Sequence, residues 1–390
     1  MVNQKMRLLG AKRSCIRELF EYGLRRAAVV GKENVFDFSL GNPSVPAPRT
    51  LDETVASLVQ GDTQALHSYT PAIGAPDTRR AVADELNRRY DCGAAAEDIF
   101  MTCGAAPALT AVLNALAGEN SEFVILAPYF PEYRVFIAAA GGRSVAVPVG
   151  DFRLSAERIA PYLSEKTQAV LVNTPNNPSG VVYTREELAA LGRLLEEKGR
   201  EFGHPIYLIS DEPYRELVYE GLEVPFIPTI YPNTIVCYSY SKSLSIPGER
   251  LGYVYVPKQA AESRAVYEAV AGAGRALGHV CAPSLMQKAL LECLSLRPDI
   301  ETYDKNRRTM YEALTSYGYE CIKPMGAFYM LIKSPDGDGE TFSLRAKEKD
   351  VLIVPCRDFG APEYLRISTC VSCDTVVRSL PLFKALIEER

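Results

Sequence analysis

The sequence predicts a three-layer α/β domain built on a mostly parallel sheet, together with a smaller α+β domain. Three observations lead to this prediction. Short apolar runs end in turn residues, helical patterns lie between these runs, and the pattern changes over roughly the last hundred residues. A chain of 390 residues, 47% of them hydrophobic, is too long for one small core and is typical of a two-domain globular protein.

The expected strands of the larger domain are almost uninterrupted apolar runs. Such runs are typical of strands that are buried on both faces of a parallel sheet. Because each run ends in proline or polar residues, each strand has a defined end. The runs cover residues 123–128, 169–175, 206–213, 234–241 and 251–257.

Between two of these runs, residues 184–199 have the pattern of an amphipathic helix. Thr184 and Glu187 have the spacing of a capping box, leucines recur on one face, and Gly199 is the expected stop. Strand, helix and strand together predict a βαβ unit. In sheets of this kind, ligands bind beyond the carboxyl ends of the strands.

The end of the chain predicts a different architecture. Helical patterns at 284–296 and 301–317 precede three strand candidates. We expect residues 49–280 to form the large domain, residues 281–390 to form the small domain, and residues 1–48 to join the small domain. The three strand candidates are residues 327–333, 351–356 and 363–369.

Charge and composition point to small-molecule partners. The formal net charge of -5 comes without a long run of either sign, so neither a nucleic-acid stripe nor a membrane-binding patch is expected. No stretch has the length and apolarity of a membrane span or a secretory signal, which predicts a cytoplasmic protein. Three histidines and ten scattered cysteines, with one CxxC at Cys370 and Cys373, predict no metal site.

Two of the strand ends carry segments that suit a polar ligand. Gly104 leads into an alanine-rich helix, and the free N–H groups near Ala105 and Ala106 suit an anionic phosphate, although an ordinary glycine turn has the same pattern. The segment NTPNNPSG at 173–180 cannot continue a helix or a strand, so it predicts a rigid loop that presents amide side chains. A tight surface turn is the alternative there.

Two further strand ends carry Asp211 and Lys242. A carboxylate at the end of an apolar strand needs a cation or donor, unless Asp211 is only the N-cap of a helix. Lys242 has Ser239 and Ser241 before it and Arg250 after it. A buried lysine beside cations becomes a good nucleophile, while serines and arginine suit a phosphate. Phosphate cradle, amide, carboxylate and lysine together predict a site for pyridoxal 5'-phosphate (PLP).

At this point the sequence resembles a fold-type I, class I aminotransferase of the aspartate, aromatic and alanine aminotransferase group. The motifs SLGNP, YTPAIG, NTPNNPSG, SDEPY, SYSKSLSIPGERLGY and YLRIS carry the resemblance, which extends over nearly the whole chain. It implies a PLP enzyme that transfers the amino group of an L-amino acid to a 2-oxo acid such as 2-oxoglutarate.

The resemblance also implies the roles of single residues. Lys242 would carry PLP as a Schiff base and move the substrate proton, and Asp211 would keep the pyridine nitrogen protonated. Asn177 and Tyr214 would donate to the phenolic oxygen of PLP, and Phe130 would stack on its ring. The phosphate would be held by Gly104, Ala105, Ala106, Ser239, Ser241 and Arg250.

The substrate and the partner subunit account for the remaining implied residues. Arg366 matches the arginine that holds the substrate carboxylate by a bidentate pair, with Asn177 and the backbone of Gly41, unless it is a surface charge. Tyr69 matches a tyrosine that reaches the PLP phosphate of the neighbouring subunit, which implies a homodimer with a shared site. Cis peptide bonds are expected before Pro128 and Pro178.

The donor amino acid stays open. Arg275 lies near the position of an arginine that binds a distal carboxylate in aspartate-specific relatives, and it has equally the pattern of a helix-surface charge. Aspartate or an aromatic amino acid is the favoured donor. A carbon–sulfur β-lyase or another PLP enzyme of this fold is the alternative function, and a PLP-sensing regulator is a third that would need a DNA-binding extension.

Overall fold

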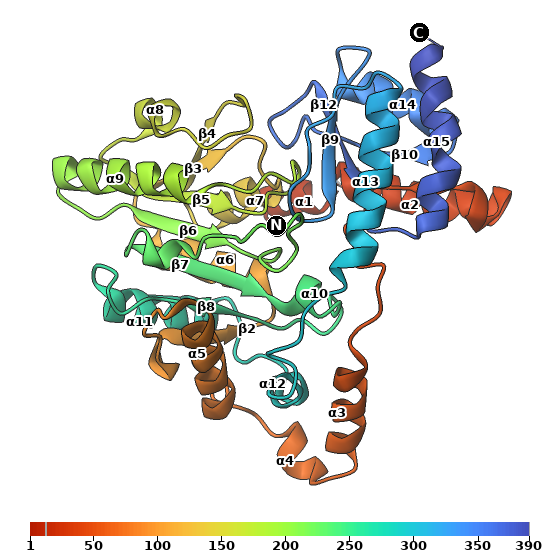
Figure 1. The fold of residues 1–390 in the computed structure, drawn as a ribbon. Helices are drawn as coiled ribbons and strands as arrows, with labels where there is room; N and C mark the ends of the chain where they lie inside the picture. Colours follow the sequence, from red (N-terminus) through yellow and green to blue (C-terminus); the bar gives the residue numbers. More distant parts are fainter. Residues whose placement is uncertain (12–13, 390) are drawn as a thin grey trace.

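The larger part of the chain is a seven-stranded sheet with helices on both faces (Figure 1). The structure is a computed structural model that describes residues 1–11 and 14–389. The sheet has the order β2-β8-β7-β6-β5-β3-β4; β8 is antiparallel to its two neighbours and the other pairs are parallel. The predicted, mostly parallel α/β sheet is thus confirmed. Its strands are β2 (Ile99–Thr102), β3 (Glu122–Leu126), β4 (Arg143–Val147), β5 (Thr167–Asn173), β6 (Tyr207–Asp211), β7 (Thr234–Ser239) and β8 (Gly252–Tyr255).

Both faces of this sheet are covered, as the apolar runs predict. Side chains alternate between the two faces: Phe100 belongs to the core on one face and Met101 to the core on the other. The first face packs against α6 (Ala105–Leu116), α7 (Glu132–Ala139) and α11 (Ser263–Ala276). The second packs against α5 (Pro76–Tyr90), α8 (Ala156–Ile159), α9 (Arg185–Phe202) and α12 (Ser284–Leu290).

Helix α9 begins as predicted and ends later than predicted. Thr184 accepts from the Glu187 N–H, and the Glu187 side chain accepts from the Thr184 N–H, which completes the capping box. Gly199 is not the stop, because it is buried within the helix. The C-cap is Gly203, whose φ of 79° is the left-handed conformation that glycine adopts without strain.

The small α+β part forms around a second, three-stranded sheet in the order β11-β12-β9. Its strands are β9 (Tyr329–Lys333), β11 (Val354–Pro355) and β12 (Tyr364–Ser368), and its helices are α13 (Ile300–Ser316), α14 (Gly339–Glu348) and α15 (Cys373–Glu388). The N-terminal strand β1 (Phe36–Asp37) pairs with β10 (Val351–Leu352), and α2 (Cys15–Val30) precedes it. The helix expected over 284–296 is shorter, since α12 ends at Leu290. The domain boundaries themselves stay a prediction.

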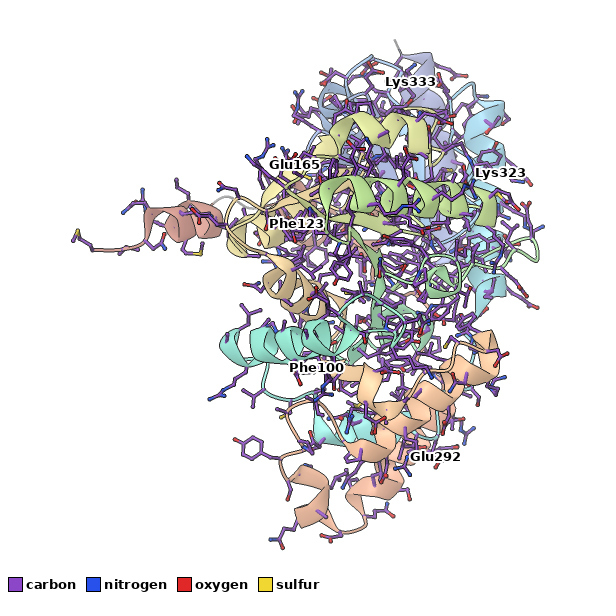
Figure 2. The ribbon with its side chains drawn as sticks, turned by 90° about the vertical axis from the view of Figure 1, so that its left-hand side faces the viewer. Phe100, Phe123, Glu165, Glu292, Lys323 and Lys333 are labelled. Carbon is purple, nitrogen blue, oxygen red and sulfur yellow. The ribbon has the colours of Figure 1, made fainter. Side chains whose placement is uncertain are left out.

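Three helices extend from the two cores. Figure 1 shows α3 (Arg49–Val59) and α4 (Thr63–His67) at the opposite end of the molecule from α15. Figure 2 shows α1 (Gln4–Ala11) projecting from the body of the molecule, and none of its residues is buried. In the described part of the chain, no helix has both the length and the apolar character needed to cross a membrane.

Candidate active site

The predicted site residues gather because several strands end at the same edge of the large sheet. In the parallel register, Asn173 lies opposite Asp211, and Asp211 lies opposite Cys237. The segments that follow β5, β6 and β7 therefore leave the sheet side by side. Gly252 brings the loop after β2 close to them, because a Cβ on Gly252 would lie 2.2 Å from the Tyr238 carbonyl oxygen and 2.9 Å from the Gly104 Cα.

Lys242 lies in α10 (Tyr240–Ser243), a single helical turn directly after β7. Its Nζ donates a hydrogen bond of 2.6 Å to the carbonyl oxygen of Gly41. Burial lowers the pKa of Lys242 to about 8, with smaller contributions from the charges of Arg250 and Arg366. The amine is therefore much easier to deprotonate than that of a solvated lysine.

Asp211 is buried, and one of its carboxyl oxygens has a partner. The Tyr133 hydroxyl donates to Oδ2 at 2.5 Å, while Oδ1 has no hydrogen-bond partner. Burial raises the pKa of Asp211 to about 7, and the bond from Tyr133 partly opposes this effect. No helix begins at Asp211, so it is not an N-cap; β6 ends there and turns follow. A buried carboxyl group with one free oxygen suits a protonated nitrogen of a ligand.

Arg366 is one of the largest fully buried side chains of the chain, with 1% exposure. It is therefore not a surface charge. Its Nη1 donates to Oδ1 of Asn177 at 3.1 Å, its Nη2 donates to the Ser39 carbonyl oxygen at 2.5 Å, and its Nε has no partner. Both acceptors are neutral amide oxygens, so the guanidinium can accept a carboxylate as an additional, oppositely charged partner.

The loop that carries Asn177 is fixed by hydrogen bonds of Asn173, the last residue of the preceding strand β5. The Asn177 N–H donates to Oδ1 of Asn173 at 2.7 Å, and Nδ2 of Asn173 donates to the Asp211 carbonyl oxygen at 2.9 Å. The peptide bonds before Pro128 and Pro178 are cis, as expected, and so is the bond before Pro175. The loop is therefore a buried part of the site and not a tight surface turn.

The predicted phosphate ligands form a cradle at the start of α6. Gly104 has a φ of 97°, and a Cβ there would lie 2.7 Å from Nη2 of Arg250. Nη1 of Arg250 donates to Oγ of Ser241 at 3.4 Å, and Oγ of Ser239 donates to the same oxygen at 2.7 Å. Ala105 and Ala106 form the first turn of α6, whose N–H groups have no acceptor within the helix. A glycine, an arginine, two serines and a helix N-terminus together suit a phosphate.

Tyr133 and Tyr329 are two site residues that the sequence reasoning missed. Tyr329, on β9, lies 3.3 Å from Tyr214 between the two hydroxyl oxygens, and the Arg366 guanidinium lies 4.5 Å from its ring centroid. A Cβ on Gly41 would lie 1.7 Å from its hydroxyl oxygen, so only glycine fits there. Tyr133 stands three residues after Phe130 in PYFPEY, and this spacing was the available signal.

Of the remaining predicted residues, one lies in the site and two are exposed away from it. These are Phe130 in the first case and Tyr69 and Arg275 in the second. The partly buried ring of Phe130 lies 5.7 Å from that of Tyr133 at an angle of 84°, which puts it beside the Asp211 pair. Tyr69 is 95% exposed in the segment after α4, and Arg275 is exposed near the end of α11. Neither is joined to the site by a contact within this subunit.

Within residues 1–11 and 14–389, no three or more histidine, cysteine, aspartate or glutamate side chains are grouped so that they could hold a metal ion. The assembled groups are an amine, a buried carboxyl group, a glycine turn beside an arginine and two serines, and a buried arginine with neutral partners.

Comparisons with known proteins show the family to which the chain is similar. The family described as aminotransferase class I and II matches residues 33–379. The aspartate/prephenate aminotransferase of Thermus thermophilus is 30% identical over 93% of each chain, and aromatic-amino-acid aminotransferase 2 of Thermococcus litoralis is 27% identical over 96% of each.

Solved structures of related proteins superpose on the whole chain. An aminotransferase from Eubacterium rectale has a TM-score of 0.97 at 50% identity and covers 100% of this chain and 99% of its own. The aspartate aminotransferase of Thermus thermophilus with maleate has a TM-score of 0.86 at 28% identity and covers 99% of this chain and 100% of its own. The chain therefore belongs to the class I and II aminotransferases, a family of enzymes that use PLP.

Proposed function

We propose that this aminotransferase holds PLP on Lys242 and transfers the amino group of an L-amino acid to a 2-oxo acid such as 2-oxoglutarate. The observation that carries the proposal is the buried carboxyl group of Asp211, whose free Oδ1 lies in the same site as an amine with a pKa of about 8. If the two groups formed a structural ion pair, each would have an opposite charge as its partner.

The residues present fit PLP. When bound, PLP supplies an aldehyde that bonds to amines and a protonated ring that withdraws electrons from the attached carbon. Asp211 would hold the proton on the ring nitrogen, since its free oxygen is buried and gains from an opposite charge. The cradle at Gly104 would accept the phosphate. Glycine is needed at this position, because a side chain larger than hydrogen would collide with Arg250.

Other residues of the site would position the ring and the substrate. Tyr214 and Asn177 would donate to the phenolic oxygen of PLP, and Phe130 would stack on the ring. Arg366 would hold the substrate carboxylate with Asn177 and the backbone of Gly41. Lys242 would then take the proton from the substrate carbon and return it, a role that suits an amine whose pKa lies near neutrality.

The experiment that tests the function is a screen of amino donors against 2-oxoglutarate and pyruvate. The purified protein with PLP should form glutamate or alanine, and it should do so only when an oxo acid is added. A β-lyase would release pyruvate and ammonia without any oxo acid. Product formation of that second kind, without transfer, would exclude the proposal.

We favour aspartate or an aromatic amino acid as the donor. The relatives named above act on these substrates according to their names, and Arg366 with Phe130 suits an α-carboxylate beside an apolar side chain. Arg275 is the residue that would distinguish the two. If it binds a distal carboxylate, Arg275→Ala should cost roughly 2–5 kcal/mol for aspartate and little for phenylalanine.

The comparison of kcat/KM for the two amino acids decides the role of Arg275. A selective loss with aspartate supports a dicarboxylate donor. An equal change with both amino acids makes Arg275 a surface residue and removes the reason to prefer aspartate.

The proposed enzyme is a homodimer with a shared site. Tyr69 is 95% exposed and makes no contact with the cradle of its own subunit, which suits a side chain that reaches the PLP phosphate of a second subunit. Helix α1, which buries none of its residues, is a further surface available to a partner.

A further inference from the structure

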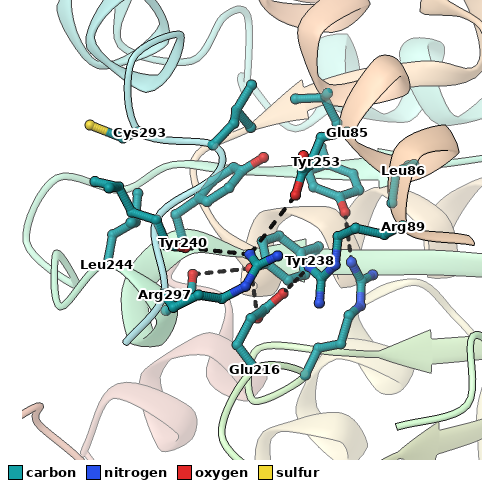
Figure 3. A pocket seen from close by; sticks show the side chains of 15 residues that line it. Glu85, Leu86, Arg89, Glu216, Tyr238, Tyr240, Leu244, Tyr253, Cys293 and Arg297 are labelled. Carbon is teal, nitrogen blue, oxygen red and sulfur yellow. Dashed lines mark hydrogen bonds and ion pairs between the residues drawn. The ribbon is translucent and has the colours of Figure 1, made fainter. Parts of the chain in front are cut away.

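A small cavity with both polar and apolar lining lies directly behind the turn that carries Lys242. It has a volume of about 30 Å³, enough for about two water molecules. Figure 3 shows its lining, which comes from α5, from the turn after β6, from β7, α10 and β8, and from residues 293–297. Glu216, Tyr238 and Ser243 line it together, and Ser243 is the neighbour of Lys242.

The turn that carries Lys242 needs such outside support. Helix α10 has four residues, and a helix this short does not hold itself together. On the side of the phosphate cradle, Oγ of Ser239 accepts from the Ser241 N–H at 3.2 Å. On the opposite side, the side-chain anchor is the contact of 3.0 Å between the hydroxyl oxygens of Ser243 and Tyr238.

The hydrogen bonds behind Ser243 lead to the carboxylate of Glu216. Glu216 accepts from Arg89 Nη1 at 2.7 Å through Oε1 and from the Tyr238 hydroxyl at 2.8 Å through Oε2. Burial raises the pKa of Tyr238 well above its ordinary value, so the phenol keeps its proton. Because that single proton goes to the carboxylate, the Ser243 hydroxyl donates to the Tyr238 oxygen. The chain of bonds therefore links Lys242's neighbour to a partly buried ion pair.

Tyr238 itself cannot move freely. The Arg215 guanidinium lies 4.6 Å from its ring centroid, and the ring of Tyr253 stacks on it at 4.9 Å and 25°. Arg215 is held in turn by an ion pair with Glu212 and by its donation to the Tyr253 hydroxyl at 3.1 Å. A hydroxyl anchored to so rigid a ring fixes the position of Ser243.

We propose that Tyr238, held by Glu216, is a positioning residue that fixes the turn of Lys242 through Ser243. The inference rests on the proposed role of Lys242. That amine must reach both the carbonyl group to which it bonds and the substrate carbon, and an error of about 1 Å in such a position costs up to about a hundredfold in rate. Tyr238 touches neither substrate nor cofactor in this account.

The test uses the PLP-loaded enzyme and three variants: Tyr238→Phe, Ser243→Ala and the double variant that combines these two changes. Each is compared with a fourth variant, Tyr253→Phe. Tyr253→Phe is the matched control. It removes a hydroxyl from the same cavity that makes no hydrogen bond to the Lys242 turn, and it keeps the stacked ring and the Glu212–Arg215 ion pair that restrain Tyr238. In the first three variants we expect kcat to fall by about tenfold with little change in KM. The double variant should be no worse than Tyr238→Phe, because the two hydroxyls act on one path.

A second readout separates positioning from stability. The readout is the rate at which an amine-selective acylating reagent labels Lys242 in the cofactor-free protein, measured as a function of pH. The curve of rate against pH should be shifted in Tyr238→Phe and Ser243→Ala. In Tyr253→Phe it should match the wild-type curve. Additive losses in the double variant, or equal behaviour of Tyr238→Phe and Tyr253→Phe, would overturn the inference. If wild-type protein does not bond PLP at Lys242, the proposed function fails instead.

Discussion

The carboxyl group of Asp211 has two oxygens in different situations, one bonded to Tyr133 and one free. The sequence predicts Asp211, because a carboxylate at the end of an apolar strand needs a reason to be there. It does not predict Tyr133, since the two residues are 78 positions apart and only the packing of α7 against the sheet brings them together. Tyr329 escaped prediction for the same reason, because it lies on β9 of the small sheet and its partner Tyr214, 115 positions away, follows β6 of the large sheet.

The hydrogen bond from Tyr133 to Asp211 leads to a prediction about the pH dependence of PLP affinity. It lowers the pKa of Asp211, so Tyr133→Phe should raise that pKa further, by on the order of one pH unit for a hydrogen bond to a charged group. A protonated Asp211 loses its attraction for a protonated ring nitrogen. PLP affinity, measured by fluorescence from pH 6 to 9, should therefore weaken most at low pH in the variant. An unshifted pH profile would contradict the assigned bond.

The raised pKa of Asp211 also affects the stability of the cofactor-free protein. Its folded pKa, about 7, lies above the unfolded value near 4, so between these values the folded state binds the extra proton. This contribution to stability is full below about pH 4 and is lost as pH rises towards 7. Thermal unfolding from pH 5 to 7.5 should therefore show a steeper loss in wild type than in Asp211→Asn, and parallel curves would refute the raised pKa.

At the scale of elements, the sequence predicts strands better than their directions. The five apolar runs correspond to β3, β5, β6, β7 and β8, yet nothing in an apolar run tells that β8 is antiparallel to β7. The edge strand β4 lies outside the predicted runs, because its exposed Arg143 and partly buried neighbours interrupt the apolar pattern. Gly199 and Gly203 look alike in sequence, and only the backbone conformation distinguishes the buried glycine from the cap.

The loop between β2 and α6 gives a prediction at this scale. Gly104→Ala adds a Cβ close to Arg250 at a φ of 97°, whereas Gly141→Ala adds one at a similarly positive φ of 85° with open space around it. Both variants should lose comparable stability, on the order of 1–2 kcal/mol. Only Gly104→Ala should bind PLP at least about tenfold more weakly, a loss of about 1.4 kcal/mol measured by titration. An equal affinity in both variants would separate Gly104 from the phosphate.

At the scale of the whole molecule, the site lies where the two parts of the chain meet. Arg366 comes from the small sheet, Asn177 from the large one and Ser39 from the segment before α3, and hydrogen bonds join all three. The motif order in the sequence predicts this assembly only through the family resemblance, since no local pattern encodes contacts between residues 189 or 327 positions apart. The resemblance also implies the expected dimer.

The proposed dimer leads to a prediction about Tyr69. If its hydroxyl reaches the phosphate in a second subunit, Tyr69→Phe should weaken PLP binding by about 1.5–3 kcal/mol, the scale of a hydrogen bond to a charged group. Sedimentation at decreasing protein concentration should show PLP loss and dissociation together. A fully active monomer, or unchanged PLP affinity in Tyr69→Phe, would contradict the shared site.

The most direct test of the central claim is to find the atom that PLP bonds. Borohydride reduction of the PLP-loaded protein, followed by digestion and mass spectrometry, should add the cofactor mass to the peptide that contains Lys242. Lys242→Ala should abolish the label and the amino transfer, while Lys305→Ala, which alters an exposed lysine on α13, should keep both. A label on another lysine, or full amino transfer by Lys242→Ala, would contradict the account.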